Sequence, residues 1–307
     1  MPLDPDVQLL VDTLAATNAP ALSAGTVDEA RRNYMLAPTP ERDDLPYVVD
    51  FDVPGDGHSV AARAYADVAQ PANLPVIVFF PGGGWVLSSI DGHDHFARRL
   101  ARVSGALVVS VDYRLAPEHP FPSPHDDCWL VTRWLQEHAA TLGGDGSRMI
   151  VAGDSAGGNL AAGVAIRARD EGLDLAAQVL IYPCTDTNQQ PYQSMRDNAT
   201  GFFLTAIDMA WFWNHYLADG GHDDPRAVPI QIASTKGLAP ALVITAEFDP
   251  LRDEGAAYAQ RLADGGVEVQ YEAIPGVVHG FIARWHTMSR AHEVHAIIGD
   301  YCRAHLA

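Results

Sequence analysis

Eight short segments rich in β-forming residues constrain the fold of this chain more than any other feature. The first two alternate apolar and polar residues, whereas the later ones are mostly continuous runs of valine, isoleucine and leucine, typical of strands covered on both faces. Stretches that look helical lie between them, so the pattern predicts an α/β domain around a mostly parallel sheet with an antiparallel edge. The predicted strands are residues 47–53, 60–66, 76–80, 107–112, 149–152, 179–182, 242–246 and 267–273, and the predicted helices include residues 95–103, 128–140, 158–170, 254–263 and 286–301.

Two regions do not follow this alternation. Residues 1–45 look helical and contain no predicted strand, and residues 185–235 contain a polar loop, an aromatic helix and a return rich in Gly, Asp and Pro. An apolar insertion between two sheet strands favours a lid over one end of the sheet, although the aromatic helix could instead belong to the core. We therefore expect a core made of residues 46–184 and 236–307, and a helical cap made of residues 1–45 and 185–235.

Composition excludes several classes of partner. The chain has 307 residues, enough for one large core or one core with a lid, and its formal net charge of −19 argues against nucleic acid and anionic membranes. The amino-terminal residues do not resemble a signal peptide, and no apolar run is long enough to span a membrane. Three widely spaced cysteines, Cys128, Cys184 and Cys302, are predicted to be reduced thiols, so we expect a cytoplasmic protein, either a monomer or a homodimer.

The sequence GDSAGG at residues 153–158 follows one predicted strand and precedes a predicted helix. This context favours a sharp turn that exposes Ser155 as a nucleophile, because the glycines on either side leave room for the turn. A serine that only caps the helix is the alternative. A serine hydroxyl also needs a base to take its proton, and that base needs a carboxylate to orient it.

The base and the carboxylate are expected after the serine, in the order carboxylate and then histidine. Asp249 lies just beyond the predicted strand 242–246, and His279 lies in the loop beyond the last one. Two other carboxylates compete with Asp249. Asp253 stands at a helix start, where capping explains it better, and Glu247 could face the edge of the core. We predict Ser155, Asp249 and His279 as a catalytic triad.

The segment GGGW at residues 82–85 follows the predicted strand 76–80. Attack on an ester carbonyl places negative charge on its oxygen, which needs hydrogen-bond donors fixed in advance. One donor is the N–H of Ala156, next to the nucleophile, and the others come from a glycine-rich loop on which side chains would block the approach. Gly83 and Gly84 are predicted to be those donors, in preference to a merely flexible loop.

Together these motifs resemble the hormone-sensitive-lipase-like esterases of the α/β-hydrolases. The matching stretches are GGGW (82–85), DYRLAPEHPFPSP (112–124), GDSAGGN (153–159), EFDPLRDEG (247–255) and HGF (279–281). The resemblance implies carboxylesterase activity with the triad and oxyanion donors named above, and no metal or organic cofactor. The family pattern begins with histidine, which is expected to brace the loop, whereas this chain has Pro81, which cannot donate a hydrogen bond but fixes φ and is expected to stiffen the turn. Tyr113, Arg114 and Glu118 are read as a structural network that holds the oxyanion loop, and Asp154 as a similar local support.

The predicted substrate is a small carboxylic ester with a short to medium acyl chain. An amidase or deacetylase would use the same triad, and a small-molecule receptor on this fold would have lost a triad member, whereas His279 is present. The pairs His93 with His95 and His292 with His295 have no third ligand at a recognisable spacing, so we read them as solvated surface and predict no metal site. The residues expected to line the substrate pocket are Trp85, Phe202, Phe203, Trp213 and Phe281.

Overall fold

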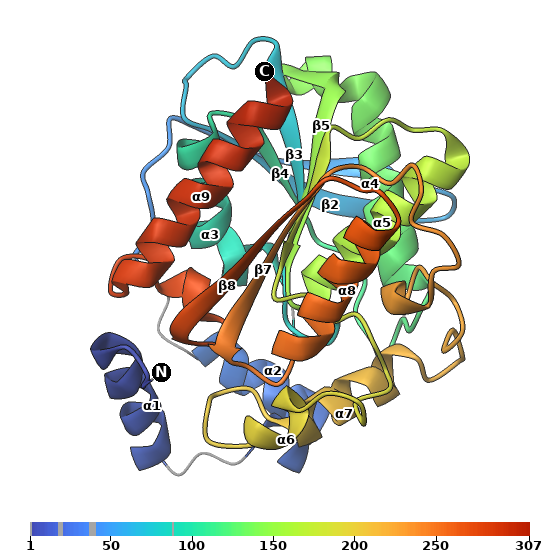
Figure 1. Ribbon diagram of the computed structural model, residues 1–307. Coiled ribbons are helices and arrows are strands. Elements are labelled where there is room, and N and C mark those ends of the chain that lie inside the picture. The colour runs from blue at the N-terminus through green and yellow to red at the C-terminus, as the bar shows by residue number, and fades with distance from the viewer. Residues whose placement is uncertain (1, 18–20, 37–40, 88) are drawn as a thin grey trace.

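A single eight-stranded sheet forms the centre of the computed structural model, which describes residues 2–17, 21–36, 41–87 and 89–307. Its strand order is β1-β2-β4-β3-β5-β6-β7-β8. The two pairings β1–β2 and β2–β4 are antiparallel and the others are parallel, which confirms the predicted fold class (Figure 1). The strands are β1 (Tyr47–Pro54), β2 (Ser59–Ala66), β3 (Leu74–Phe80), β4 (Leu107–Val111), β5 (Gly144–Asp154), β6 (Ala177–Ile181), β7 (Ala241–Phe248) and β8 (Val269–Val278).

Helices cover both faces of the sheet (Figure 1). Helices α3 (Ile90–Ser104) and α9 (Ser289–Leu306) lie on one face, and α4 (Ser123–His138), α5 (Ala156–Glu171) and α8 (Arg252–Asp264) lie on the other. Strand β3 shows why its apolar run is continuous. Val76, Val78 and Phe80 belong to the apolar core under α4 and α5, whereas Ile77 and Phe79 belong to the core under α3 and α9. Alternate side chains of the strand are thus buried on opposite faces.

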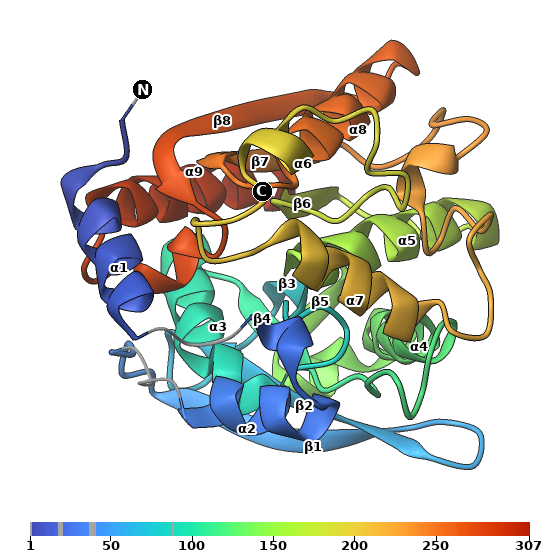
Figure 2. The same cartoon turned by 90° about the horizontal axis from the view of Figure 1, so that it is seen from below.

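The elements outside the alternation gather at one end of the sheet. They are α1 (Pro5–Ala16), the 3-10 turn η1 (Leu22–Ala24), α2 (Val27–Leu36), α6 (Ser194–Asp197), α7 (Ala206–Tyr216) and the 3-10 turn η3 (Pro229–Gln231). Figure 2 shows α2, α6 and α7 on the viewer's side of the strands. The elements that precede β1 contact those inserted between β6 and β7, because the backbone N–H of Ser23 donates to Asp208 on α7 at 2.9 Å. This arrangement agrees with a cap, although the exact division of the chain into core and cap stays a prediction.

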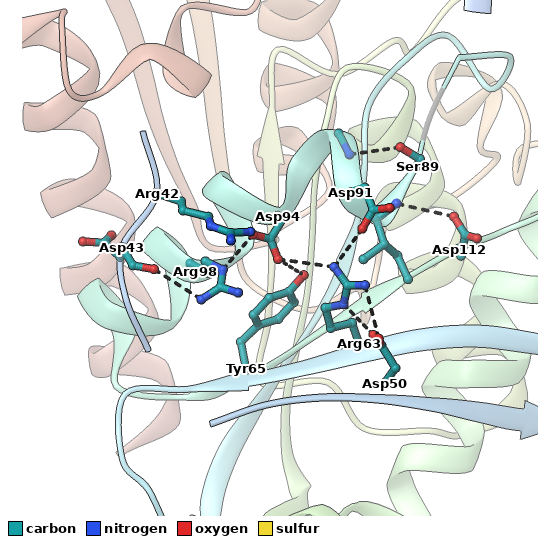
Figure 3. A network of polar contacts seen from close by, with 12 residues as sticks. Arg42, Asp43, Asp50, Arg63, Tyr65, Ser89, Asp91, Asp94, Arg98 and Asp112 are labelled. Atoms are coloured by element: carbon teal, nitrogen blue, oxygen red, sulfur yellow. Dashed lines mark hydrogen bonds and ion pairs between the residues drawn. The ribbon is translucent and has the colours of Figure 1, made fainter. Parts of the chain in front are cut away.

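The start of helix α3 is fixed to strand β2 by a polar network (Figure 3). Ser89 caps the helix by accepting a hydrogen bond from the Gly92 N–H at 3.0 Å. Arg63 on β2 donates to Asp91 at 2.9 Å, and Tyr65 on β2 donates to Asp94 at 3.1 Å. This anchoring fixes the helix that immediately follows the glycine-rich loop.

The interpretation of the paired histidines as solvated surface is wrong for three of the four. His93, His95 and His295 are buried, and only His292 is exposed. The reason is that α3 and α9 pack against each other on the sheet, which encloses side chains of both helices. Burial lowers the pKa of His95 to about 4 and that of His295 to about 3. Within the described residues, no helix has the length and apolarity needed to cross a bilayer.

Candidate active site

Ser155 occupies the sharp turn between β5 and α5. Its backbone has φ 57° and ψ −119°, a conformation that costs a non-glycine residue about 1–3 kcal/mol and persists only where its surroundings fix it. The neighbouring glycines explain how the turn is possible. A Cβ at Gly153 would collide with the backbone of Gly157, and a Cβ at Gly157 would collide with the carbonyl of Phe80. Sequence and fold thus present Ser155 at the carboxyl end of a central strand, with 8% of its surface exposed.

Asp249 and His279 meet Ser155 from the ends of β7 and β8, the last two strands of the sheet, which β6 separates from β5. Asp249 directly follows β7 and His279 directly follows β8. His279 Nε2 lies 2.9 Å from Ser155 Oγ, and its Nδ1 lies 2.7 Å from Asp249 Oδ2. A carboxylate can only accept, so Nδ1 carries the proton in this pairing and Nε2 is free to accept from the serine hydroxyl. Asp249 is fully buried, and its other oxygen accepts from the N–H of Leu251 at 2.9 Å.

The two competing carboxylates have other partners. Asp253 accepts from the N–H of Ser194 at 2.7 Å and pairs with Arg252 at 2.8 Å, so it ties α6 to α8. The expected capping role of Asp253 is wrong, because the residue lies inside the first turn of α8 and its oxygens point to these partners. Glu247 accepts from the N–H of Gly276 at 2.8 Å. The structure therefore brings Asp249, of the three carboxylates, into contact with His279.

The glycine-rich loop after β3 is braced at the peptide bond between Pro81 and Gly82. The Tyr113 hydroxyl donates to the Pro81 carbonyl at 2.6 Å, and the Gly82 N–H donates to Asp154 at 2.9 Å. These contacts support the start of the loop, where this chain has Pro81 in place of the family's histidine. The glycines that follow have positive φ values, 124° at Gly83 and 61° at Gly84, which favour glycine over any other residue.

Asp154 is held as a carboxylate at the centre of this brace. Burial opposes its ionisation, but His93 at 3.4 Å and the Gly82 N–H outweigh burial, so the pKa of Asp154 is lowered. His93 on α3 is thus a site residue that sequence reasoning missed. It was missed because the pair His93 and His95 was considered only as metal ligands and, without a third ligand, was interpreted as solvated surface.

Comparison with known proteins identifies the family. A protein-family sequence model, described as the α/β-hydrolase fold, matches residues 77–283 of the chain. The carboxylesterase NlhH of Mycobacterium tuberculosis is 41% identical over 288 residues, which cover 91% of this chain and 89% of that protein. The chain belongs to the α/β-hydrolase family. The predicted resemblance to its hormone-sensitive-lipase-like esterases is thereby confirmed.

Two further similar proteins can be aligned with this α/β-hydrolase over its whole length. An ethyl acetate hydrolase of Pseudomonas putida is 35% identical over 322 aligned positions that cover 100% of both proteins. The crystal structure of a thermostable esterase from Pseudomonas putida matches with a TM-score of 0.95 at 34% identity, covering 100% of this chain and 98% of that one. The similarity therefore includes the segments outside the strand and helix alternation.

The aromatic residues predicted for the substrate pocket of this hydrolase lie in different places. Trp85 stacks on Tyr216 with ring centroids 4.3 Å apart and lies 4.4 Å from Trp213. Phe281 is fully buried, with its ring 6.0 Å from that of Tyr182, whose ring lies 4.5 Å from that of His279. Their roles toward a substrate stay predictions.

The two phenylalanines of the cap loop differ in exposure. Phe202 packs on Phe248 with centroids 5.1 Å apart, whereas Phe203 is 52% exposed and lies near Gly280, beside the predicted base. Phe212 on α7 is a neighbour of the glycine-rich loop that the sequence did not indicate. A Cβ at Gly84 would collide with its ring, so Phe212 covers the glycine-rich loop directly.

Cys184 is a second neighbour that the sequence did not place. Its Sγ lies 4.0 Å from Ser155 Oγ. Burial raises the pKa of the Cys184 thiol well above its ordinary value, so the sulfur stays neutral and is a poor nucleophile. Cys128, Cys184 and Cys302 are all buried and free, as expected for reduced thiols.

Proposed function

We propose that the protein is a serine carboxylesterase that cleaves short- to medium-chain carboxylic esters through an acyl-enzyme. The observation that carries this proposal is the chain of two hydrogen bonds, 2.9 Å from Ser155 to His279 and 2.7 Å from His279 to Asp249. Ester hydrolysis as the reaction class is confirmed by the carboxylesterase relatives. The roles of individual residues, the acyl-enzyme and the preferred acyl length are our proposal.

In the proposed mechanism, His279 acts first as a base. Its Nε2 takes the proton of Ser155 as Oγ attacks the ester carbonyl, and buried Asp249 stabilises the imidazolium that forms. The imidazolium then gives its proton to the departing alcohol, which leaves the acyl group on Ser155. Water attacks this acyl-enzyme with His279 again as the base, and the serine is released.

The negative charge of the tetrahedral intermediate would be stabilised by backbone N–H groups. Ala156 is the first residue of α5, whose N-terminus carries partial positive charge. Gly83 and Gly84 lie on the loop that Asp154 and Tyr113 brace, so their N–H groups would be fixed before the substrate arrives. The proposal assigns these three N–H groups to the oxyanion hole.

Parallel assays on an ester and its matching amide test the reaction class. We expect hydrolysis of a p-nitrophenyl ester, covalent inactivation by a phosphonate ester, and little activity on the amide. Faster cleavage of the amide would favour the amidase or deacetylase alternative. Binding without turnover would favour the receptor, which is the less supported alternative because the structure keeps all three triad side chains in contact. The proposal includes a cytoplasmic location, which the three free cysteines support.

We expect an activity optimum at about four to six acyl carbons, because each buried methylene contributes about 0.8 kcal/mol until overpacking costs about 1–3 kcal/mol. The cap supplies large rings near the loop and the base, Phe212 against Gly84 and Phe203 against Gly280. These rings limit the length of an acyl chain that can be accommodated. The measurement is kcat/KM over a series of p-nitrophenyl esters, and an optimum at twelve carbons or beyond would contradict this view of the pocket.

A further inference from the structure

One side chain of helix α2, Arg31, reaches the loop that carries the proposed oxyanion donors. Its Nε donates to the carbonyl of Val86 at 2.9 Å, and its Nη2 donates to the carbonyl of Ala116 at 3.0 Å. The same guanidinium forms two hydrogen bonds of 2.7 Å with the carboxylate of Glu118. The planar fork of an arginine can satisfy all these acceptors at once, which a lysine cannot.

Both backbone acceptors of Arg31 are directly connected to the glycine-rich loop. Val86 donates its N–H to the carbonyl of Gly83 at 3.1 Å, and Ala116 donates its N–H to the carbonyl of Trp85 at 3.0 Å. Arg31 thus binds Val86, which directly follows the loop, and Ala116, which is hydrogen-bonded to the loop at Trp85. A displacement of Arg31 would therefore shift the neighbouring peptide units, those of Gly83 and Gly84.

The loop needs such support because its conformation is unusual. Trp85 has φ 59°, which is rare for a bulky residue and persists only where neighbours impose it. From α7, Tyr216 stacks on the Trp85 ring with an interplanar angle of 3°, and Phe212 covers Gly84. Arg31 adds a polar contact from α2, so two separate cap segments hold the same loop.

We propose that Arg31 is a positioning residue that holds the backbone N–H groups of Gly83 and Gly84 in the geometry required for the oxyanion. This inference rests on the proposed esterase function. Arg31 acts through the loop and need not touch the substrate. The hydrogen bonds from Arg31 lower the pKa of Glu118 to about 2, so the pair is charged at the neutral pH of an esterase assay.

The chain offers a matched control at the other end of the sheet. Arg148 pairs with Asp145 at 2.8 Å and donates to the carbonyls of Leu306 and Asn73 at 3.1 and 2.7 Å. Its side chain is 32% exposed, against 27% for Arg31, and it lies near the start of β5, whereas Ser155 follows the end of that strand. Arg148→Met therefore removes an equivalent set of contacts far from the proposed oxyanion hole.

The test compares kinetics of Arg31→Met, Arg31→Lys and Arg148→Met on one p-nitrophenyl ester. Since misplacing catalytic groups by a fraction of an ångström to one ångström costs up to about 10²-fold, we expect Arg31→Met to lower kcat about 10- to 100-fold with KM changed less than about threefold. Arg31→Lys keeps the charge without the fork and should remain at least about fivefold below wild type. Arg148→Met should lower the melting temperature about as much as Arg31→Met does, while its kcat stays within about twofold of wild type.

Hydrogen exchange at the Val86 amide gives a readout that does not depend on activity. We expect exchange to be faster in Arg31→Met than in wild type and unchanged in Arg148→Met. A wild-type protein that hydrolysed no ester would overturn the proposed function, and the exchange rate would then decide the loop contact by itself. Should Arg31→Met fail to fold, Glu118→Gln supplies the same two readouts.

Three results would overturn the inference while leaving the esterase proposal intact. The first is a kcat of Arg31→Met within about twofold of wild type, because the loss expected from misplaced oxyanion donors is much larger. The second is an equal loss of kcat in Arg148→Met, because that would reveal a general effect of stability. The third is unchanged exchange at Val86 in Arg31→Met.

Discussion

Replacing Ser155 with alanine is expected to lower kcat by about 10⁴ to 10⁶, because the members of a triad act as a unit and the remaining two cannot form an acyl-enzyme. The structure places Oγ 2.9 Å from His279 Nε2, so the substitution removes the atom that attacks the carbonyl. Folding should survive. The side chain lies at a turn made possible by Gly153 and Gly157, and alanine leaves both glycines in place. Initial rates over a wide range of enzyme concentration, with thermal melting of both proteins, measure the two effects.

Covalent labelling provides the control for the Ser155→Ala prediction. A phosphonate ester should add its mass to the peptide that contains Ser155 in wild type and to no peptide in Ser155→Ala. Cys184→Ala is the matched neighbour, since its sulfur lies 4.0 Å from Oγ, and it should retain the label and most of the activity. EDTA should leave the wild-type rate unchanged. A tenth of the wild-type activity remaining in Ser155→Ala would remove this residue from the proposed role.

The fold could be predicted because its signal is local. Apolar runs of strand length separated by helical stretches identify a covered parallel sheet, and all eight predicted strands are present. Their ends were less predictable. Strand β5 begins at Gly144, before the apolar run that starts at Met149, because its first residues pair with β3 at Leu74 and need no apolar side chains to do so. Hydrogen bonds between strands extended β5 beyond what hydrophobicity alone indicated.

The candidate triad could also be located, because its residues follow strands whose carboxyl ends meet at one edge of the sheet. Sequence alone could not indicate contacts made across long separations. Arg31 and Glu118 are 87 residues apart, and neither has a local pattern that points to the other. The burial of His295 likewise depends on how α9 packs against α3, which the spacing of residues within α9 does not reveal.

Asp249→Asn is expected to lower kcat by about 10⁴ while the protein stays folded, because the imidazole would hold the wrong tautomer. Asp249 Oδ1 accepts from the Leu251 N–H at 2.9 Å, and the asparagine oxygen can keep that bond. Its amide nitrogen then replaces Oδ2, 2.7 Å from His279 Nδ1, and presents a donor to a donor. To relieve this conflict, the ring carries its proton on Nε2, where it can no longer accept from Ser155. The measurement is kcat at several pH values, with the melting temperature as a check on folding.

Asp253→Asn is the matched control, because it is the same change in a carboxylate only four positions along the chain. Asp253 holds Ser194 and pairs with Arg252, so the substitution should cost about 1 kcal/mol or less of stability and change kcat by less than about tenfold. The two variants thus separate the effect of losing a negative charge near the triad from the effect of losing the acceptor for His279 Nδ1. A large loss in Asp253→Asn with a small one in Asp249→Asn would transfer the orienting role to Asp253. Equal losses in both would indicate that the charge of this segment, and not the contact with His279, supports the reaction.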